Sequence, residues 1–157
     1  MIAELALAAT IAIMSPTAAG TYQLTGYNNP LDTTYTLVDT PISFYQGRKY
    51  VEADNQLRYC IRYRESRHSY SAKSDTGKYR GAYQMSKEFK NGMAWMIQKE
   101  LRQTGTPKIK AQAIGKILRG APVNRWNPYY QDFAFWMGWD NGKGASHWAQ
   151  TGWSAKC

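Results

Sequence analysis

One carboxylate stands inside a strongly cationic stretch of the sequence, where an acid could do chemistry. Glu65 lies in "CIRYRESRHSY", residues 60–70, directly before Ser66. A carboxyl at the edge of an apolar core has its charged form disfavoured by desolvation, so its pKa rises and it can hold a proton near neutral pH. Cleavage of a glycosidic bond needs such a group to protonate the leaving oxygen. The alternative is a helix-end residue paired with Arg62 or Arg64, which would make a poor acid.

The only other carboxylate in the stretch 64–85 is that of Asp75. In a glycosidase that uses two carboxylates, Asp75 could be the second group, across a cleft from Glu65. The residue types favour a plainer interpretation, a turn aspartate within Ser74-Asp75-Thr76-Gly77.

Two cysteines, Cys60 and Cys157, are either free thiols or one disulfide. A terminal cysteine is well suited to fixing a chain end, which favours the disulfide and an oxidising compartment. Such a bridge would close a loop of about 100 residues and stabilise the fold by roughly 4–5 kcal/mol. The two histidines, His68 and His147, add no paired metal-ligand spacing, and no glycine-rich phosphate loop precedes a helix. We therefore expect neither a metal nor a cofactor.

The residues before Glu65 predict the helix that would position it, ending near Ser66. Its apolar side chains recur at three- and four-residue spacing: Tyr50, Ala53, Leu57, Cys60 and Ile61. Glu65 comes four residues after Ile61, so it should lean toward the buried side of the last turn. Arg58 and Arg62 are expected to face away from that side.

The remaining elements predict an α+β fold, mostly helical with one small β-hairpin beside this helix. The hairpin would join runs 70–73 and 78–84 around a turn in which Gly77 takes a positive φ. Further helices are predicted from Ser86 to Gly105, over 106–120, and over 127–142, followed by a short helical turn in the tail.

The N-terminal part of the chain differs in composition from the rest of its 157 residues. Residues 5–14 form an apolar run that is too short to span a bilayer, and we interpret 1–19 as a secretory signal or an apolar N-terminal segment. Residues 20–45 are predicted to be an arm or linker with a short strand near 35–38. Residues 46–157 would then form one domain, and no transmembrane span is expected.

The formal charge of +9, from 20 Lys and Arg against 11 Asp and Glu, favours a polyanionic partner such as nucleic acid, an anionic membrane or an acidic bacterial wall. Twelve Tyr and six Trp suit the stacking of sugar rings as well as of bases. The stretch "RWNPYYQDFAFWMGWD" holds more aromatic residues than one helix face can hide. We therefore expect part of this set to line a surface, with Trp126 as a ligand contact: Trp126, Tyr129, Tyr130 and Trp139.

Taken together, "RESRHSYSAKSDTGKYRGAYQM" resembles the lysozyme-like, transglycosylase-like family that includes the resuscitation-promoting factors of actinobacteria. The shared pattern is a glutamate that closes a helix, a short hairpin and a Gly-x-x-Gln motif, here Glu65-Ser66 and Gly81-Ala82-Tyr83-Gln84. The ending "GASHWAQTGWSAKC" is also similar. Where many relatives have glycines this chain has Arg67 and His68, so its cleft wall would be bulkier and more basic.

The resemblance implies a lysozyme-like domain in which Glu65 is the catalytic acid and Cys60 pairs with Cys157. It further implies substrate contacts by Tyr83 and Gln84, with Ser66 beside the acid. A single essential acid suits a lytic transglycosylase that cleaves peptidoglycan glycan strands between N-acetylmuramic acid and N-acetylglucosamine. A hydrolytic muramidase would need Asp75 as a second carboxylate.

The expected partners are therefore glycan strands and anionic wall polymers rather than nucleic acid, and the expected state is a secreted or envelope-associated monomer. A bacterial enzyme acting on its own wall, and a phage virion or lysis protein acting on a host wall, both fit. Two other classes stay open: a wall-binding module of the same fold without turnover, and a nucleic-acid binder supported by charge and aromatic content alone.

Overall fold

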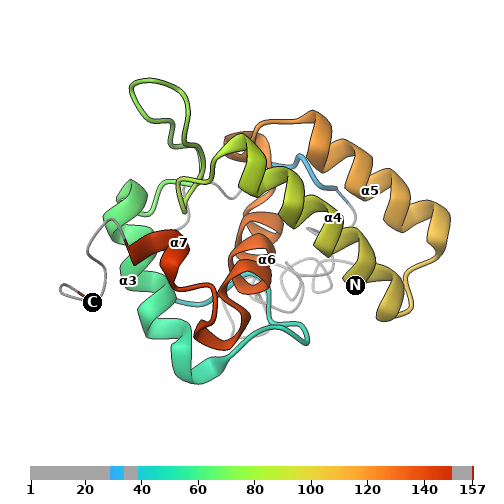
Figure 1. Ribbon diagram of the computed structural model, residues 1–157, viewed down its shortest axis with the longest axis horizontal. Helices are drawn as coiled ribbons and strands as arrows, with labels where there is room; N and C mark the ends of the chain where they lie inside the picture. The colour runs from blue at the N-terminus through green and yellow to red at the C-terminus, as the bar shows by residue number, and fades with distance from the viewer. Residues whose placement is uncertain (1–28, 34–38, 150–156) are drawn as a thin grey trace, which may run out of the picture.

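The computed structural model describes residues 29–33, 39–149 and 157 (Figure 1). The proposed signal segment 1–19 and the strand predicted at 35–38 lie outside these residues. The helices are α3 (Asn55–Ser66), α4 (Lys87–Gln103), α5 (Lys108–Gly120), α6 (Pro128–Trp139) and α7 (Ser146–Ala149), with 3-10 turns at Glu52–Asp54, Val123–Arg125 and Asp140–Gly142. Within the described ranges, no helix combines the length and apolar character needed to cross a bilayer.

The helix boundaries agree with the predicted capping signals. The Ser86 side chain accepts a hydrogen bond from the backbone N–H of Phe89 at 3.2 Å, which satisfies an otherwise unpaired donor in the first turn of α4. Beyond the end of α4, Gly105 takes a φ of +95°. Asn127 caps α6 in the same way as Ser86 caps α4, and Pro128 occupies the first turn.

Helix α6 is the centre of the molecule. All twelve of its residues are buried, so it is enclosed on every side rather than along one stripe. Helices α4 and α5 pack together on one side of α6, and α3 and α7 lie on the other (Figure 1). The prediction that aromatic residues of this segment line a surface is therefore wrong, since the exposed fraction of Trp126, Tyr129, Tyr130 and Trp139 is 8% or less.

The predicted β-hairpin is absent, and the described residues contain no β-strand, so the α+β assignment is wrong. Residues 69–85 form a loop that projects beside α3 and α4 (Figure 1). Its β-type pairing is limited to two isolated antiparallel bridges, Lys73 with Arg80 and Arg80 with Met85. The ladder ends after one pair on each side because Gly81 and Gln84, with φ of +78° and +47°, turn the chain. Gly77 has the positive φ that was predicted, +69°.

The described end of the arm belongs to the core. Ser43, Phe44 and Tyr45 are buried, and the Tyr45 ring stacks on Phe133 with centroids 4.0 Å apart. Residues 43–45 therefore pack as part of the domain rather than as a linker. Their burial could not be predicted from apolar periodicity, because they lie in an irregular segment.

Candidate functional site

Glu65 occupies the last turn of α3, at the point where the chain leaves the helix. The helix ends because Arg67 and His68 take left-handed backbone conformations, with φ of +52° and +67°. The Arg67 N–H donates to the carbonyl oxygen of Tyr63 at 2.8 Å, which closes the final turn. The Glu65 side chain is half-buried and its Oε1 atom is covered from solvent. This position at the core edge agrees with the lean that the helical spacing predicted.

Ser66 joins the end of α3 to the loop that follows. Its hydroxyl donates to the carbonyl oxygen of Ala82 at 2.9 Å and lies 3.1 Å from the carbonyl oxygen of Arg62. The N–H of Ala82 in turn donates to Oε1 of the buried Gln131 at 2.9 Å. The backbone two residues before Gln84 is therefore held between α3 and α6.

The Gly81–Gln84 segment is a tight turn whose shape depends on its glycine. A Cβ on Gly81 would lie 2.5 Å from both the Gln131 Oε1 atom and the Val123 Cγ1 atom, and the φ of +78° disfavours any side chain. Gln84 also has a positive φ, and its Nε2 donates to the carbonyl oxygen of Gly81 at 2.9 Å. A non-glycine residue in this conformation is a form of strain that clusters at functional sites.

A hollow of about 120 Å³ opens beside this turn. The indole N–H of Trp148 donates to the carbonyl oxygen of Tyr83 at 3.2 Å and so brings α7 to its edge. Its more accessible rings, those of Tyr79, Phe89 and His147, stand beside the Gln84 carboxamide, a combination that suits a sugar ring. Among the lining residues are Tyr79, Tyr83, Gln84, Phe89, His147 and Trp148. Glu65 does not line this hollow. Its helix, α3, is joined to the same turn by the hydrogen bond between Ser66 and Ala82.

Two residues expected to contact substrate are in the core instead. Trp126 is fully buried, and its indole N–H donates to the carbonyl oxygens of Leu118 and Ala121. The Tyr83 side chain is 1% exposed, and its hydroxyl donates to Asp132 at 2.6 Å. Both aromatic rings therefore position the loop and α6, because their polar atoms are already satisfied inside the protein.

Asp75 lies at the exposed tip of the projecting loop. The turn around it is held by other groups: the Gly77 N–H donates to the carbonyl oxygen of Ser74 at 2.8 Å, and the Ser74 hydroxyl accepts from the Tyr79 N–H at 3.1 Å. The structure thus links the helix end of Glu65 and Ser66 to the turn that bears Gln84, and it places Asp75 in an exposed turn of the same loop.

A buried polar network beneath the site was not predicted. Asp132 on α6 accepts hydrogen bonds from Tyr70 and Tyr83 on Oδ1, and from the N–H of Phe44 at 2.8 Å on Oδ2. The Arg58 guanidinium lies 3.5 Å from the same carboxylate. The available signal was the pair Gln131-Asp132, two polar residues inside an otherwise apolar helix.

Arg58 and Arg62 were expected to face away from the core, and that prediction is wrong. Both side chains are fully buried. Arg58 donates to Tyr83, and Arg62 donates to Tyr70, to the carbonyl oxygen of Thr40 at 2.8 Å and to His68 Nδ1 at 3.1 Å. Burial disfavours the charge on Arg58, but Tyr83 and Asp132 raise its pKa overall. Helical spacing could not reveal this, because the partners come from distant segments.

The disulfide prediction is confirmed. Cys60 and Cys157 are bonded, with their Cα atoms 5.7 Å apart and 97 positions apart in sequence. The bridge ties the last residue to α3 one turn before Glu65. Its chain-entropy contribution is about 4–5 kcal/mol.

No protein-family model matches the sequence, and neither a curated protein nor a solved structure matches it. In the described ranges, no cluster of three His, Cys, Asp or Glu side chains is placed to hold a metal ion. The interpretation of the site therefore depends on its own geometry.

Proposed function

We propose that this protein cleaves peptidoglycan glycan strands as a lytic transglycosylase, with Glu65 as its single catalytic acid and base. The observation that carries the proposal is the hydrogen bond of 2.9 Å from the Ser66 hydroxyl to the carbonyl oxygen of Ala82. It joins the helix end that bears Glu65 to the turn that bears Gln84 and the aromatic hollow. The helix end that bears the acid and the turn that borders the polar and aromatic hollow are thus directly linked.

In this mechanism the Glu65 carboxyl donates its proton to the glycosidic oxygen that links N-acetylmuramic acid to N-acetylglucosamine. The bond from the muramyl anomeric carbon to that oxygen breaks, and the N-acetylglucosamine end leaves with a free hydroxyl. The Glu65 carboxylate then takes the proton of the muramyl 6-hydroxyl, whose oxygen bonds to the anomeric carbon. The product carries a 1,6-anhydro ring, no water is consumed, and Glu65 regains its proton.

The position of Asp75 favours this route over hydrolysis. A hydrolytic muramidase with two carboxylates holds them roughly 5–10 Å apart across the scissile bond. Asp75 lies at the exposed tip of the loop, and its turn is held by Ser74 and Gly77. We therefore assign Asp75 no role in the chemistry.

Secretion or an envelope location follows from the same proposal. The disulfide fits an oxidising compartment. The charge of +9 fits adhesion to an anionic wall, and that adhesion should weaken with salt.

The test is mass spectrometry of purified peptidoglycan digested by the wild-type protein and by Asp75→Asn. Anhydro-muropeptides from both proteins are the expected result. Products with free reducing ends, lost in Asp75→Asn, would show hydrolysis with a second carboxylate. Release of no fragments by the wild type, with retained binding to the wall, would mean a binding module.

A further inference from the structure

A second and larger cavity lies beside the aromatic hollow. Its volume is about 500 Å³, and it is lined by residues from the ranges 77–90 and 119–123. It therefore lies between the projecting loop, the start of α4 and the end of α5. Met85 and Ser86 line both this cavity and the hollow beside Gln84, so the two are neighbours.

The cavity wall is strongly cationic. Five of its side chains carry positive charge: Lys78, Arg80, Lys87, Lys90 and Arg119. The single acid in the lining, Glu88, is engaged at the start of α4, where hydrogen bonds from its own backbone N–H and from Ser86 lower its pKa. The same helix end, the first turn of a 17-residue helix, adds the positive end of a macrodipole.

Lys90 places an ammonium group inside the wall. Its side chain is 6% exposed, and Nζ donates to the carbonyl oxygens of Arg119 at 2.6 Å and Ala121 at 3.3 Å. Burial, together with nearby Lys87 and Arg119, lowers the pKa of Lys90. No ion pair involving any of the five cations is present in the described part of the chain. A buried ammonium that meets only carbonyls and other cations is stabilised by any anion that enters.

The sequence outside the described ranges adds almost no acidic side chains. Residues 1–28, 34–38 and 150–156 together contain one acidic side chain, that of Glu4. The described wall of the cavity therefore carries an excess of positive charge.

We propose that this cavity binds an oxyanion carried as a substituent on the glycan strand whose sugar occupies the neighbouring hollow. This inference rests on the proposed function, because Met85 and Ser86 line both spaces and so place the cavity next to a sugar bound in the hollow. Two substituents of the wall have the required chemistry, the carboxylates of the stem peptide and the phosphodiesters of an attached polymer. Lys78, Lys87 and the guanidinium of Arg80, whose Nε donates to the carbonyl oxygen of Gly77 at 3.1 Å, suit either one.

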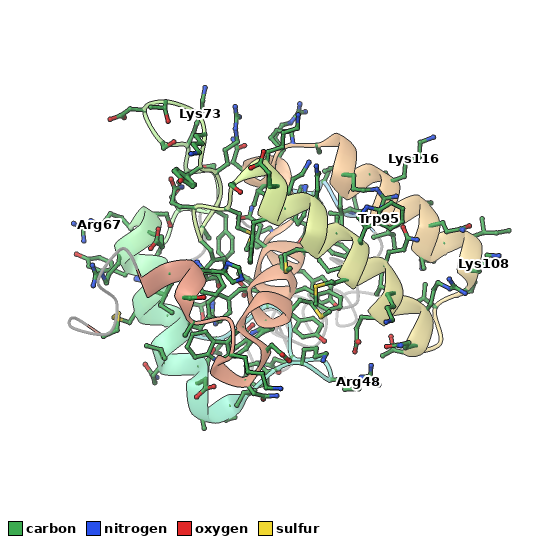
Figure 2. All side chains as sticks on the ribbon, viewed as in Figure 1. Arg48, Arg67, Lys73, Trp95, Lys108 and Lys116 are labelled. Atoms are coloured by element: carbon green, nitrogen blue, oxygen red, sulfur yellow. A yellow bond between two sulfur atoms is a disulfide. The ribbon has the colours of Figure 1, made fainter. Side chains whose placement is uncertain are left out.

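The test measures binding to purified sacculi by full-length protein carrying Glu65→Gln, so that turnover does not interfere. In that background, Lys78→Gln/Arg80→Gln/Lys87→Gln removes three of the more accessible cavity cations. A matched control, Lys99→Gln/Lys108→Gln/Lys116→Gln, removes the same charge from exposed positions on α4 and α5 outside the cavity; Lys108 and Lys116 lie along α5 in Figure 2. A charge-conserving variant, Lys78→Arg/Arg80→Lys/Lys87→Arg, separates charge from folding, which thermal melting checks for every protein.

We expect the cavity variant to bind intact sacculi at least about tenfold more weakly than the control variant, and the charge-conserving variant to keep its affinity. Stem peptides can be removed from the sacculi with an amidase, and phosphodiesters with hydrofluoric acid. The treatment that abolishes the difference in affinity between the cavity and control variants identifies which substituent supplies the oxyanion. Equal weakening by the control, undiminished binding to glycan stripped of both groups, or tighter binding to a DNA oligonucleotide would each overturn the proposal. Fragment release by the wild type on the same sacculi tests the proposed function separately.

Discussion

The hydroxyl of Ser66 donates a hydrogen bond to the carbonyl oxygen of Ala82 at 2.9 Å. Ser66 and Ala82 are 16 positions apart in the sequence. Their hydrogen bond joins the end of α3, which bears Glu65, to the turn that bears Gln84. The residue that follows Glu65 therefore fixes the end of α3 to the turn that bears Gln84.

Replacing Ser66 with alanine should lower the free energy of unfolding by about 1 kcal/mol, because the carbonyl of the buried Ala82 loses its hydrogen-bond donor. Fragment release from peptidoglycan should fall by more than this loss of stability explains, since Glu65 and Gln84 are no longer held together. Denaturant titration and a release assay measure the two effects. Ser71→Ala, at an exposed position on the same loop, should change neither; equal effects of both substitutions would refute the role of Ser66.

Asp132→Asn should be among the most destabilising single changes in the chain. It keeps the shape of the side chain but leaves the buried Arg58 charge without its carboxylate, which typically costs about 3–5 kcal/mol. Chemical denaturation of Asp132→Asn against Asp75→Asn, an exposed change of the same kind, measures the effect. A loss below about 1 kcal/mol would mean that Tyr83 and the other contacts of Arg58 suffice without Asp132.

Breaking the disulfide should destabilise the fold by about 4–5 kcal/mol, because the unfolded chain regains the freedom of a long loop. The double substitution Cys60→Ser/Cys157→Ser, compared with the oxidised wild type in denaturant, tests this. Reductant should bring the wild type down to the stability of the double variant. If the double variant equals the oxidised wild type, the bridge adds nothing to the stability of α3 and its acid.

The stability of the α3 end should depend on pH through His68. Burial and the neighbouring Arg62 lower the pKa of His68 in the folded protein. The unfolded chain takes up the proton at the ordinary pKa of about 6.5, so the stabilisation is complete above that pH and is lost as the pH falls below it. The Nδ1 atom that accepts from Arg62 must stay unprotonated for their bond to persist.

His68→Asn removes this titration and tolerates the left-handed backbone at that position. Unfolding free energies of the two proteins, measured from about pH 7.5 to pH 5.5, should differ increasingly in favour of the variant as the pH falls. A pH-independent difference would show that His68 does not titrate in this range.

The sequence was sufficient for the features that depend on neighbouring residues. Ser86, Asn127-Pro128 and Gly105 mark helix boundaries by capping chemistry, and each acts within one turn. The disulfide was also predictable, because only one pair of cysteines exists. The position of Glu65 at the core edge followed from its spacing after Ile61.

The features that depend on distant residues could not be predicted. Arginines are usually exposed, and Arg58 is buried only because Asp132, 74 positions away, and Tyr83 meet it in the core. The apolar pattern of α6 indicated one buried face, whereas the surrounding helices enclose all of it. The turn residues of the 69–85 loop suggested a hairpin, but Gly81 and Gln84 redirect the chain before a ladder can form.

The most direct test of the catalytic role of Glu65 is the rate at which Glu65→Gln releases soluble fragments from purified peptidoglycan. We expect a decrease of roughly 10²–10⁴-fold, with an unchanged melting temperature and retained binding to sacculi, because only the transferable proton is lost. Glu52→Gln, the same substitution at an exposed position, should release fragments at the wild-type rate. Release by Glu65→Gln at the wild-type rate would contradict the assignment and leave Glu65 as the end of a helix.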